Sequence, residues 1–373
     1  MSASAPKDTS GNRTLSKAKS AKQDEFYTQL SDIENELRHY REQLRGKTVL
    51  CNCDDPYESN FFRYFALNFN GLGLQKLIAT SYDGSSVAGV RLPLLDIQGL
   101  KPEGKQPYAV EITNVPDANG DGAIDLTDVE LLLKSDGNVS HTLRGDAEFG
   151  AGDFRSAECI EFLKQADVVV TNPPFSLFRE YVAQLIAYEK QFLVIGNMNA
   201  VHYSDIFNFF RDNKLWLGES IHSGDREFRV PAHYPLEAAG SRVDAAGNKY
   251  IRVKGVRWFT NMDNPNRHEM LPLYKRYDAT EFPTYDNFNA IEVAKTSEIP
   301  CDFFGFIGVP DSFMDKFNPD QFELIGIPFG NLGKSIGVTK NFRGRTDIAI
   351  TQDGKSRCPY SRIIIRRRVP NAD

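Results

Sequence analysis

The segment that could do chemistry most directly is DVVVTNPPF, residues 167–175. Asn172 follows a run of β-branched residues, and Pro173, Pro174 and Phe175 come directly after it. A proline ring fixes the backbone dihedral φ, so a carbonyl at this position points in a set direction. The Asn172 side-chain oxygen and the Pro173 carbonyl can therefore act as two acceptors at fixed geometry beside an aromatic ring. The alternative is a Pro-Pro turn with a buried phenylalanine.

Two other segments complete a recognisable set. Residues 24–28 read DEFYT, and residues 51–56 read CNCDDP after the first expected strand. Together with NPPFSLF at 172–178, they make the chain resemble the EcoRI-type family of adenine-specific DNA methyltransferases, through most of residues 24–368. The resemblance implies a Rossmann-like methyltransferase fold that uses S-adenosylmethionine, and an adenine flipped out of duplex DNA. It also implies a target-recognition region after the catalytic half.

The resemblance assigns roles to the residues of the catalytic loop. N6 of adenine is a poor nucleophile because its lone pair is delocalised into the ring. Asn172 and the Pro173 carbonyl would hold both N6 protons and favour a tetrahedral nitrogen, while Phe175 would stack on the flipped base. Two other readings stay open: a methyltransferase for RNA adenine or a protein amide, and a non-catalytic DNA- or calcium-binding protein on this scaffold.

The resemblance also places part of the cofactor site near the amino terminus. The region of Tyr27 and Thr28 matches the motif that meets the methionine end of S-adenosylmethionine. The glycine-rich loop usual in the wider superfamily is missing after the first strand, and Asp54, Asp55 and Pro56 occupy its place. A turn without glycine can still present carboxylates to an ammonium group.

The other cofactor contacts are expected from position in the fold. Asp83 comes just after the second expected strand, where it is either a ribose contact or a turn aspartate in Tyr-Asp-Gly. Asp153 and Phe154 lie where the superfamily places an acidic-aromatic pair for the cofactor adenine. Asp146 is the competing acidic residue.

A calcium-loop pattern lies upstream of the catalytic loop. Residues 117–128 carry oxygen-bearing side chains at loop positions 1, 3, 5, 9 and 12 and glycine at position 6. The candidate ligands are Asp117, Asn119, Asp121, Asp125 and Asp128. The segment before the loop, 111–116, is expected to be extended, and a helix is expected at 126–134. The alternative is a polar turn rich in Asx residues, and any bound calcium would be structural.

Both ends of the chain are basic although the net charge is −6. Residues 1–23 are rich in Ser, Ala and Lys and are predicted to be a disordered tail. Residues 334–368 hold ten basic side chains against two acidic ones, an excess of +8. They are interpreted as a phosphate-contact surface on duplex DNA, with a solvated basic strand as the alternative. The predicted DNA-binding residues are Arg343, Arg345, Arg362, Arg366, Arg367 and Arg368.

Composition sets the class of protein. The 373 residues are 41% hydrophobic, with no apolar run of membrane-spanning length and no signal-peptide pattern. Five cysteines without zinc-finger spacing fit free thiols. We therefore expect an intracellular protein with no membrane association. The resemblance implies a cytoplasmic enzyme of bacterial or phage type, and no obligate protein partner is evident in the sequence.

The elements that must position these motifs are expected to alternate. An amphipathic helix is predicted at 24–45. Short strands, apolar on both faces, are predicted at 48–53, 77–82, 168–171 and 192–196, with helices at 60–69 and 177–188. This order predicts a doubly wound α/β sheet whose ligand crevice lies at the carboxyl ends of the strands.

The remaining chain is divided by pattern. Strands at 214–217 and 254–260 are expected to end the catalytic sheet, with Trp258 or Phe259 as a second wall for the base or, with more weight, as core residues. The catalytic domain is predicted at 24–264, with the calcium-loop-like insertion at about 111–136. The target-recognition region is predicted at 265–373, where the alternating rhythm stops.

Overall fold

The computed structural model describes residues 26–53, 56, 59–82, 107–122, 124–135, 140–230, 234, 236 and 240–369. The predicted tail at 1–23 and the candidates Asp54, Asp55 and Asp83 lie outside the described residues. The chain forms two compact units, the first of Met1–Met198 with Gly218–Met262 and the second of Asn199–Leu217 with Asp263–Asp373. Among the described residues, no helix has the length and apolar character needed to span a bilayer.

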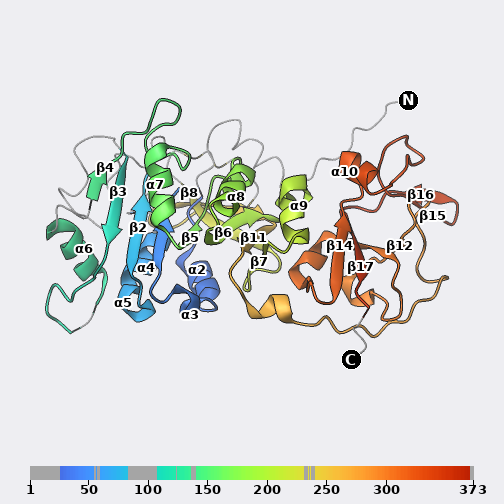
Figure 1. The fold of residues 1–373 in the computed structure, drawn as a ribbon, viewed down its shortest axis with the longest axis horizontal. Helices are drawn as coiled ribbons and strands as arrows, with labels where there is room; N and C mark the ends of the chain where they lie inside the picture. The colour runs from blue at the N-terminus through green and yellow to red at the C-terminus, as the bar shows by residue number, and fades with distance from the viewer. Residues whose placement is uncertain are drawn as a thin grey trace. The chain divides into compact units, whose positions relative to one another are not determined.

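The first unit is built on a large mixed sheet (Figure 1), in which the strands run in the order β4-β3-β2-β1-β5-β6-β11. β1 pairs in parallel with β2 and β5, and β5 pairs in parallel with β6, whereas β3, β4 and β11 are antiparallel to their neighbours. The strands are β1 (Thr48–Cys51), β2 (Lys76–Thr80), β3 (Tyr108–Ile112), β4 (Ser140–Thr142), β5 (Val168–Thr171), β6 (Gln191–Asn197) and β11 (Val256–Thr260).

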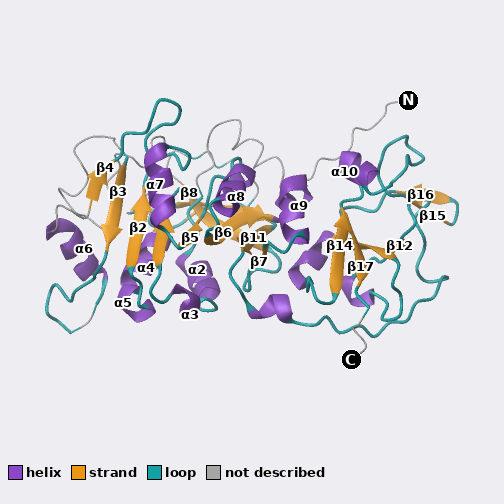
Figure 2. Cartoon of the chain, viewed as in Figure 1, coloured by secondary structure: helices purple, strands orange, loops and turns teal. Residues whose placement is uncertain are grey.

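Helices, which are purple in Figure 2, lie against this sheet. α4 contacts β2, α7 contacts β1, and α8 contacts β6. The helices of the unit are α2 (Leu30–Leu37), α3 (Arg41–Leu44), α4 (Asn60–Leu67), α5 (Phe69–Leu72), α6 (Leu126–Ser135), α7 (Ala157–Gln165) and α8 (Phe178–Ala187). The 3-10 turn η1 (Met198–His202) begins at Met198 and continues into the residues of the second unit. The α/β class and the strands predicted at 48–53, 77–82, 168–171 and 192–196 are confirmed, with ends shifted by up to two residues.

Burial explains why the central strands are so apolar. All four residues of β1 and of β5 are buried, as expected for strands covered on both faces. β5 lies between β1 and β6, so the residue after Thr171 leaves the sheet from its interior and not from an edge. The catalytic-loop motif therefore begins at a rigid point of the fold.

The prediction of one continuous helix over residues 24–45 is wrong. The structure has α2 and α3 separated at residues 38–40, and residues 26–28 are not helical. The apolar repeat still identifies the buried face, because Ile33, Leu37, Tyr40 and Leu44 are each fully buried. Tyr27 instead forms an antiparallel bridge with Arg229, and this pairing is incompatible with a helix that starts at residue 24.

A second, three-stranded sheet of the first unit supplies that bridge. Its order is β8-β10-β9, with both pairs antiparallel. The strands are β8 (Asp225–Val230), β9 (Arg242–Val243) and β10 (Lys249–Lys254). Main-chain hydrogen bonds join Tyr27 to Arg229 in both directions, at 2.9 and 3.2 Å. This contact carries the amino-terminal motif onto β8.

The second unit contains an antiparallel core. β13 and β14 flank β17, β12 joins β13 in parallel, and α9 packs on β14. Its elements are β7 (Trp216–Leu217), β12 (Ile291–Glu292), β13 (Phe306–Pro310), β14 (Phe322–Gly326), β15 (Ile350–Gln352), β16 (Lys355–Arg357), β17 (Arg362–Arg367), α9 (Ser204–Arg211), α10 (Gly330–Ser335), η2 (Pro265–His268), η3 (Thr296–Glu298) and η4 (Asp311–Lys316).

The two units do not follow one cut in the sequence. Residues 199–217 belong to the second unit, although the sequence pattern puts them with the catalytic half. The segment contains α9, whose buried residues Ile206, Phe207 and Phe210 explain why it needs an apolar partner such as β14.

Candidate active site

The catalytic-loop motif lies where β5 ends. Asn172 is buried, with 5% of its surface exposed, and the turn after it is closed by a 2.9 Å hydrogen bond from the Leu177 amide to the Pro174 carbonyl. Two prolines and this bond restrict the backbone before α8 begins at Phe178. The fold therefore presents Asn172 from a stiff connection.

The Asn172 carboxamide is bonded on one side only. Its Nδ2 donates to the main-chain carbonyl of Phe26, and this fixes which way the amide faces. Its Oδ1 is buried and has no hydrogen-bond partner in the part of the chain that the structure describes. Leaving such an acceptor unsatisfied costs about 1–3 kcal/mol, so an orphaned oxygen in a native fold calls for an explanation. A bound donor would supply one.

Aromatic rings surround the loop. Phe175 is partly buried, with its ring centroid 5.5 Å from that of Phe26 and 6.5 Å from that of Phe228, to which it stands edge-on at 89°. The ring centroid of Tyr234 lies 6.3 Å from that of Phe26. Phe26, Phe228 and Tyr234 were missed by the sequence reasoning. Only Phe26 lay inside a quoted motif, and nothing local marks Phe228 on β8 as a neighbour of the loop.

The two aromatic residues suggested as a second wall are core residues. Trp258 and Phe259 on β11 are fully buried. Trp258 packs edge-on against Phe61 at 6.0 Å, and Phe259 against Phe178 at 4.9 Å. The reading of these rings as core is confirmed.

The amino-terminal motif is brought to the catalytic loop. Phe26 bonds Asn172, and the next residues, Tyr27 and Thr28, are buried. The Asn60 side chain at the start of α4 donates to the Thr28 carbonyl at 2.7 Å. Thr28 Oγ1 is buried and has no partner among the residues described. A second orphaned polar atom thus lies in the segment predicted to meet the cofactor.

The carboxyl end of β1 is tied to β5 and α8. Thr171 Oγ1 donates to the Asn52 carbonyl, and the Tyr181 hydroxyl donates to Asn52 Oδ1. Burial raises the pKa of Tyr181 well above its usual range, so it stays a neutral donor. Cys53 has a left-handed φ of 71°, which turns the chain sharply after the strand. Pro56 is buried beyond this turn.

The loop at 144–156 approaches the end of β2. Gly152 has φ +75°, and a Cβ there would lie 1.9 Å from the Ser81 carbonyl oxygen, so only glycine permits this approach. Phe154 is buried and packs edge-on against Tyr181 at 5.0 Å. The Asp153 carboxylate accepts from Arg155 Nε at 2.9 Å and Nη2 at 2.7 Å. Asp153 and Phe154 therefore lie at the strand carboxyl ends, but the acid has an internal cation.

Asp146, the competing acid, fixes the same loop. Its carboxylate accepts the main-chain amides of Phe149, Glu148 and Ala157 at 2.7–2.9 Å. These bonds lower the pKa of Asp146 below its usual value, and the bond from the Phe149 amide has the largest effect. Asp146 is thereby a loop and helix-start residue.

The calcium-loop candidates bond to main-chain amides. Asp117 accepts from Gly120, Asp121 and Gly122 at 2.7–3.2 Å. Asp128, fully buried, accepts from Ala118, Asn119 and Asp125 at 2.8–3.2 Å. These bonds, that of Asp125 first, lower the pKa of the Asp128 carboxyl.

These bonds leave little for a cation. Asn119 donates to Asp121, and Asp125 accepts from Thr127. The described residues hold no cluster of three or more His, Cys, Asp or Glu side chains suited to a metal. The calcium prediction is not supported, and the contacts fit the alternative of a self-bonded Asx-rich turn. The expected helix is present as α6.

The predicted DNA-binding arginines differ in their surroundings. Arg362 forms an ion pair with Glu292, of which 3% is exposed, and Arg366 forms one with half-buried Glu323. Arg367 donates to the Cys301 carbonyl and Arg368 to the Pro319 carbonyl. Arg343 and Arg345 are exposed on a turn after α10.

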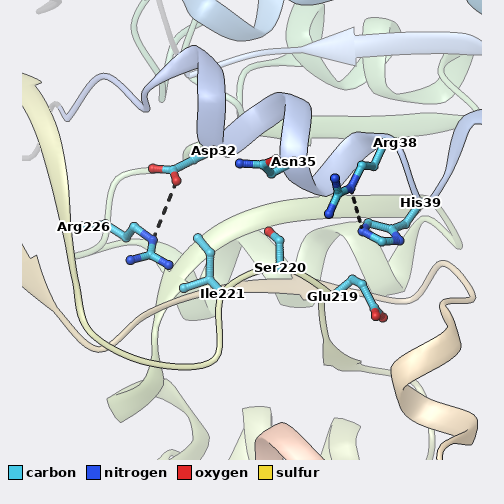
Figure 3. A pocket seen from close by; sticks show the side chains of 8 residues that line it. All are labelled: Asp32, Asn35, Arg38, His39, Glu219, Ser220, Ile221 and Arg226. Atoms are coloured by element: carbon cyan, nitrogen blue, oxygen red, sulfur yellow. Dashed lines mark hydrogen bonds and ion pairs between the residues drawn. The ribbon is translucent and has the colours of Figure 1, made fainter.

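A separate polar hollow lies between α2 and the chain before β8 (Figure 3), with a volume of about 380 Å³. Asp32 faces Arg226 across it at 3.7 Å, and Arg38 Nε contacts His39 at 3.2 Å. Burial raises the pKa of Asp32 and the charge of Arg226 opposes this. Both charge signs line the hollow, so it selects no clear ligand class.

Known proteins are similar to this chain over nearly its whole length. The family model described as adenine-specific methyltransferase EcoRI matches residues 14–368. The type II methyltransferase M.EcoRI of Escherichia coli is 43% identical over 96% of this chain and 97% of its own length. The type II methyltransferase M.MpnI of Mycoplasma pneumoniae is 36% identical over 95% and 98%. No solved structure gives a significant match. The chain therefore belongs to the EcoRI family of adenine-specific methyltransferases.

Proposed function

We propose that this protein transfers a methyl group from S-adenosylmethionine to N6 of an adenine flipped out of duplex DNA, as the methyltransferase of a type II restriction-modification system. Its relatives are named as type II methyltransferases. The single observation that carries the proposal is the buried Asn172 Oδ1, oriented by the Phe26 carbonyl and lacking a partner among the described residues. An exocyclic amine would supply the missing donor.

The reacting nitrogen needs two acceptors. Asn172 Oδ1 and the Pro173 carbonyl would each accept one N6 proton and draw the nitrogen lone pair out of conjugation with the ring. S-adenosylmethionine supplies a methyl group on a positively charged sulfur. Methyl transfer would form the N–C bond as the C–S bond breaks; the sulfur would keep the bonding pair, and N6 would lose one proton to solvent.

The flipped base needs a surface that replaces its stacking in the duplex. Phe175 is held by Phe26 and Phe228 yet is only partly buried. Base–aromatic stacking is worth about 1–3 kcal/mol, comparable with the cost of unstacking one base. Phe175 would therefore bind the adenine, and its supporting rings would hold Phe175.

The cofactor would lie along the carboxyl ends of the parallel strands of a Rossmann-like sheet. Thr28 Oγ1, which has no partner among the described residues, and the close approach at Gly152 fit a ligand that passes between these segments. Thr28 would meet its methionine end, and Phe154 its adenine. Asp54, Asp55 and Asp83 remain candidates for its charged and ribose groups.

The second unit would carry target recognition, with Arg343 and Arg345 as its phosphate contacts. This assignment rests on the exposure of those arginines and on the absence of a βαβ order in the described part of that unit. The bases read depend on which side chains reach the groove edges.

Expression in a host that lacks adenine methylation tests the proposal. Sequencing the genomic DNA should show N6-methyladenine at one short recurring sequence, and the Asn172→Ala protein, expressed at the same level, should leave the DNA unmodified. Methyl incorporation into RNA or protein with none into DNA would overturn the proposed substrate. Equal modification by both proteins would overturn the role of Asn172.

A further inference from the structure

An exposed aromatic ring stands among cations on one turn of the second unit. Residues 340–345, which we name the Phe342 turn, read KNFRGR. Phe342 is 54% exposed, an unusual exposure for a phenylalanine. Lys340, Arg343 and Arg345 around it are exposed as well.

The turn is fixed by Asn341, which is buried. Asn341 Oδ1 accepts the amides of Arg343 at 2.8 Å and Arg345 at 3.3 Å. Its Nδ2 donates to the Asp347 carbonyl at 3.1 Å and to Cys358 Sγ at 3.3 Å. Gly344 has φ +69° and closes the turn with a 2.8 Å bond to the Asn341 carbonyl. The exposure of Phe342 is therefore held by the fold.

The cations of the turn are not neutralised. Among the residues that the structure describes, no carboxylate lies within ion-pair distance of Lys340, Arg343 or Arg345. The Arg343 guanidinium lies 5.0 Å from the centre of the Phe342 ring, which leaves its hydrogen-bond donors for an outside partner. An exposed apolar ring with positive charges around it suits a polyanion that also has apolar faces.

We propose that the Phe342 turn contacts duplex DNA, with Phe342 inserted between base steps as a wedge and Arg343 and Arg345 on the flanking phosphates. Apolar wedges of this kind unstack a step and kink the duplex. A protein partner fits less well, because one ring offers far less than the roughly 1,000 Å² of a specific protein interface. The inference rests on the proposed function for its choice of DNA.

The test uses the full-length protein and end-labelled duplexes that carry the methylation site. Energy transfer between the ends should report a kink with wild-type protein that Phe342→Ala abolishes and Phe342→Leu partly keeps. Affinity should fall about 5- to 150-fold in the alanine variant, the stacking increment of about 1–3 kcal/mol. Tyr274→Ala, which removes another exposed ring of the same unit, is the control and should change neither quantity.

Variants of the two arginines distinguish an inserted wedge from a clamp that contacts only phosphates. Replacing Arg343 and Arg345 with Gln should reduce the slope of log affinity against log salt by about one unit per contact. A reduced slope with an unchanged kink in Phe342→Ala would overturn the wedge and leave a phosphate clamp. The same kink measurement on random-sequence duplexes does not need the methylation site. If Phe342→Ala loses the kink there while the wild type modifies no DNA in the genomic assay, the proposed reaction fails and the wedge stands.

Discussion

The catalytic loop and strand β17 both present polar side chains that the sequence marks as functional, and the fold treats them in opposite ways. At the end of β5, one side of the Asn172 amide is bonded and the other is left open among the described residues. On β17, Arg362 meets a buried carboxylate and Arg366 meets Glu323. An open acceptor in a buried place costs free energy and needs a ligand to explain it, whereas a satisfied charge is explained by the fold itself.

A basic side chain can carry a charge without being available to an outside ligand. A count of basic residues between 334 and 368 gives the same weight to Arg362 and Arg343. In the structure, 12% of the Arg362 side chain is exposed, and its guanidinium accounts for the buried charge of Glu292. Arg343 has no such partner among the described residues and lies on a fixed, exposed turn.

The largest effect is expected on folding stability, when the ion pair of Arg362 on β17 is broken. Arg362→Met leaves Glu292 and the Tyr285 hydroxyl that donates to it buried without their cation. Loss of one partner of a buried pair costs about 3–5 kcal/mol, which urea unfolding followed by fluorescence should detect. Arg366→Met, which breaks an exposed pair, should cost at most about 1 kcal/mol.

A double replacement sharpens that result. Arg362→Met with Glu292→Leu removes both charges and should recover much of the lost stability, because an apolar pair of similar volume can replace a buried ion pair. A double variant no more stable than Arg362→Met alone would mean that the arginine acts through other contacts.

Breaking the catalytic side should affect chemistry and not folding. Asn172→Ala removes one of two acceptors for the amine, so the single-turnover rate of methyl transfer should fall about 10²- to 10³-fold, or about 2.7–4 kcal/mol. S-adenosylmethionine affinity by calorimetry should change little. Asn172→Asp, which keeps the acceptor but cannot donate to the Phe26 carbonyl, tests whether that bond orients the side chain. Wild-type turnover in either variant would contradict the corresponding role.

The ring beside Asn172 should have a smaller effect. Phe175→Ala should weaken capture of the extruded adenine by about 1–3 kcal/mol, while Phe175→Tyr keeps a stacking face. Fluorescence of 2-aminopurine at the target position reports extrusion. Phe228→Leu, which removes a supporting ring, should give an intermediate signal; an alanine variant with the wild-type signal would show that Phe175 is only a core residue.

Local pattern predicted the elements and the loop, and long-range contacts decided the rest. The β-branched run before Asn172 predicted β5 within the sheet, because burial on both faces leaves a local composition signal. The bond that orients Asn172 joins residues 146 positions apart, and it depends on the bridge from Tyr27 to β8. No periodicity reports such a contact.

The partners of the side chains in the basic region and in the calcium-like loop could not be predicted for a related reason. Glu292 lies 70 positions from Arg362, so the sequence could not show that this arginine is already paired. In the loop, the spacing of Asp117 to Asp128 suits both a cation and main-chain amides. Only the contacts in the folded chain distinguish the two, because the same oxygens accept either kind of partner.

The smallest effect, on the salt dependence of DNA binding, is expected for Arg366 and Arg368, which already have partners within the protein. Arg366 and Arg368 are exposed in part but are held by Glu323 and the Pro319 carbonyl. If these bonds persist on DNA, Arg366→Gln with Arg368→Gln should leave the salt slope within about half a unit of wild type, against about one unit for each phosphate contact truly lost. Sequence preference should not change. A slope that falls by about two units would show that the arginines leave their internal partners for phosphate, whereas a loss on the cognate site alone would place them on base edges. Either result would erase the distinction between β17 and the Phe342 turn, since an internal partner would then not predict which cations bind DNA.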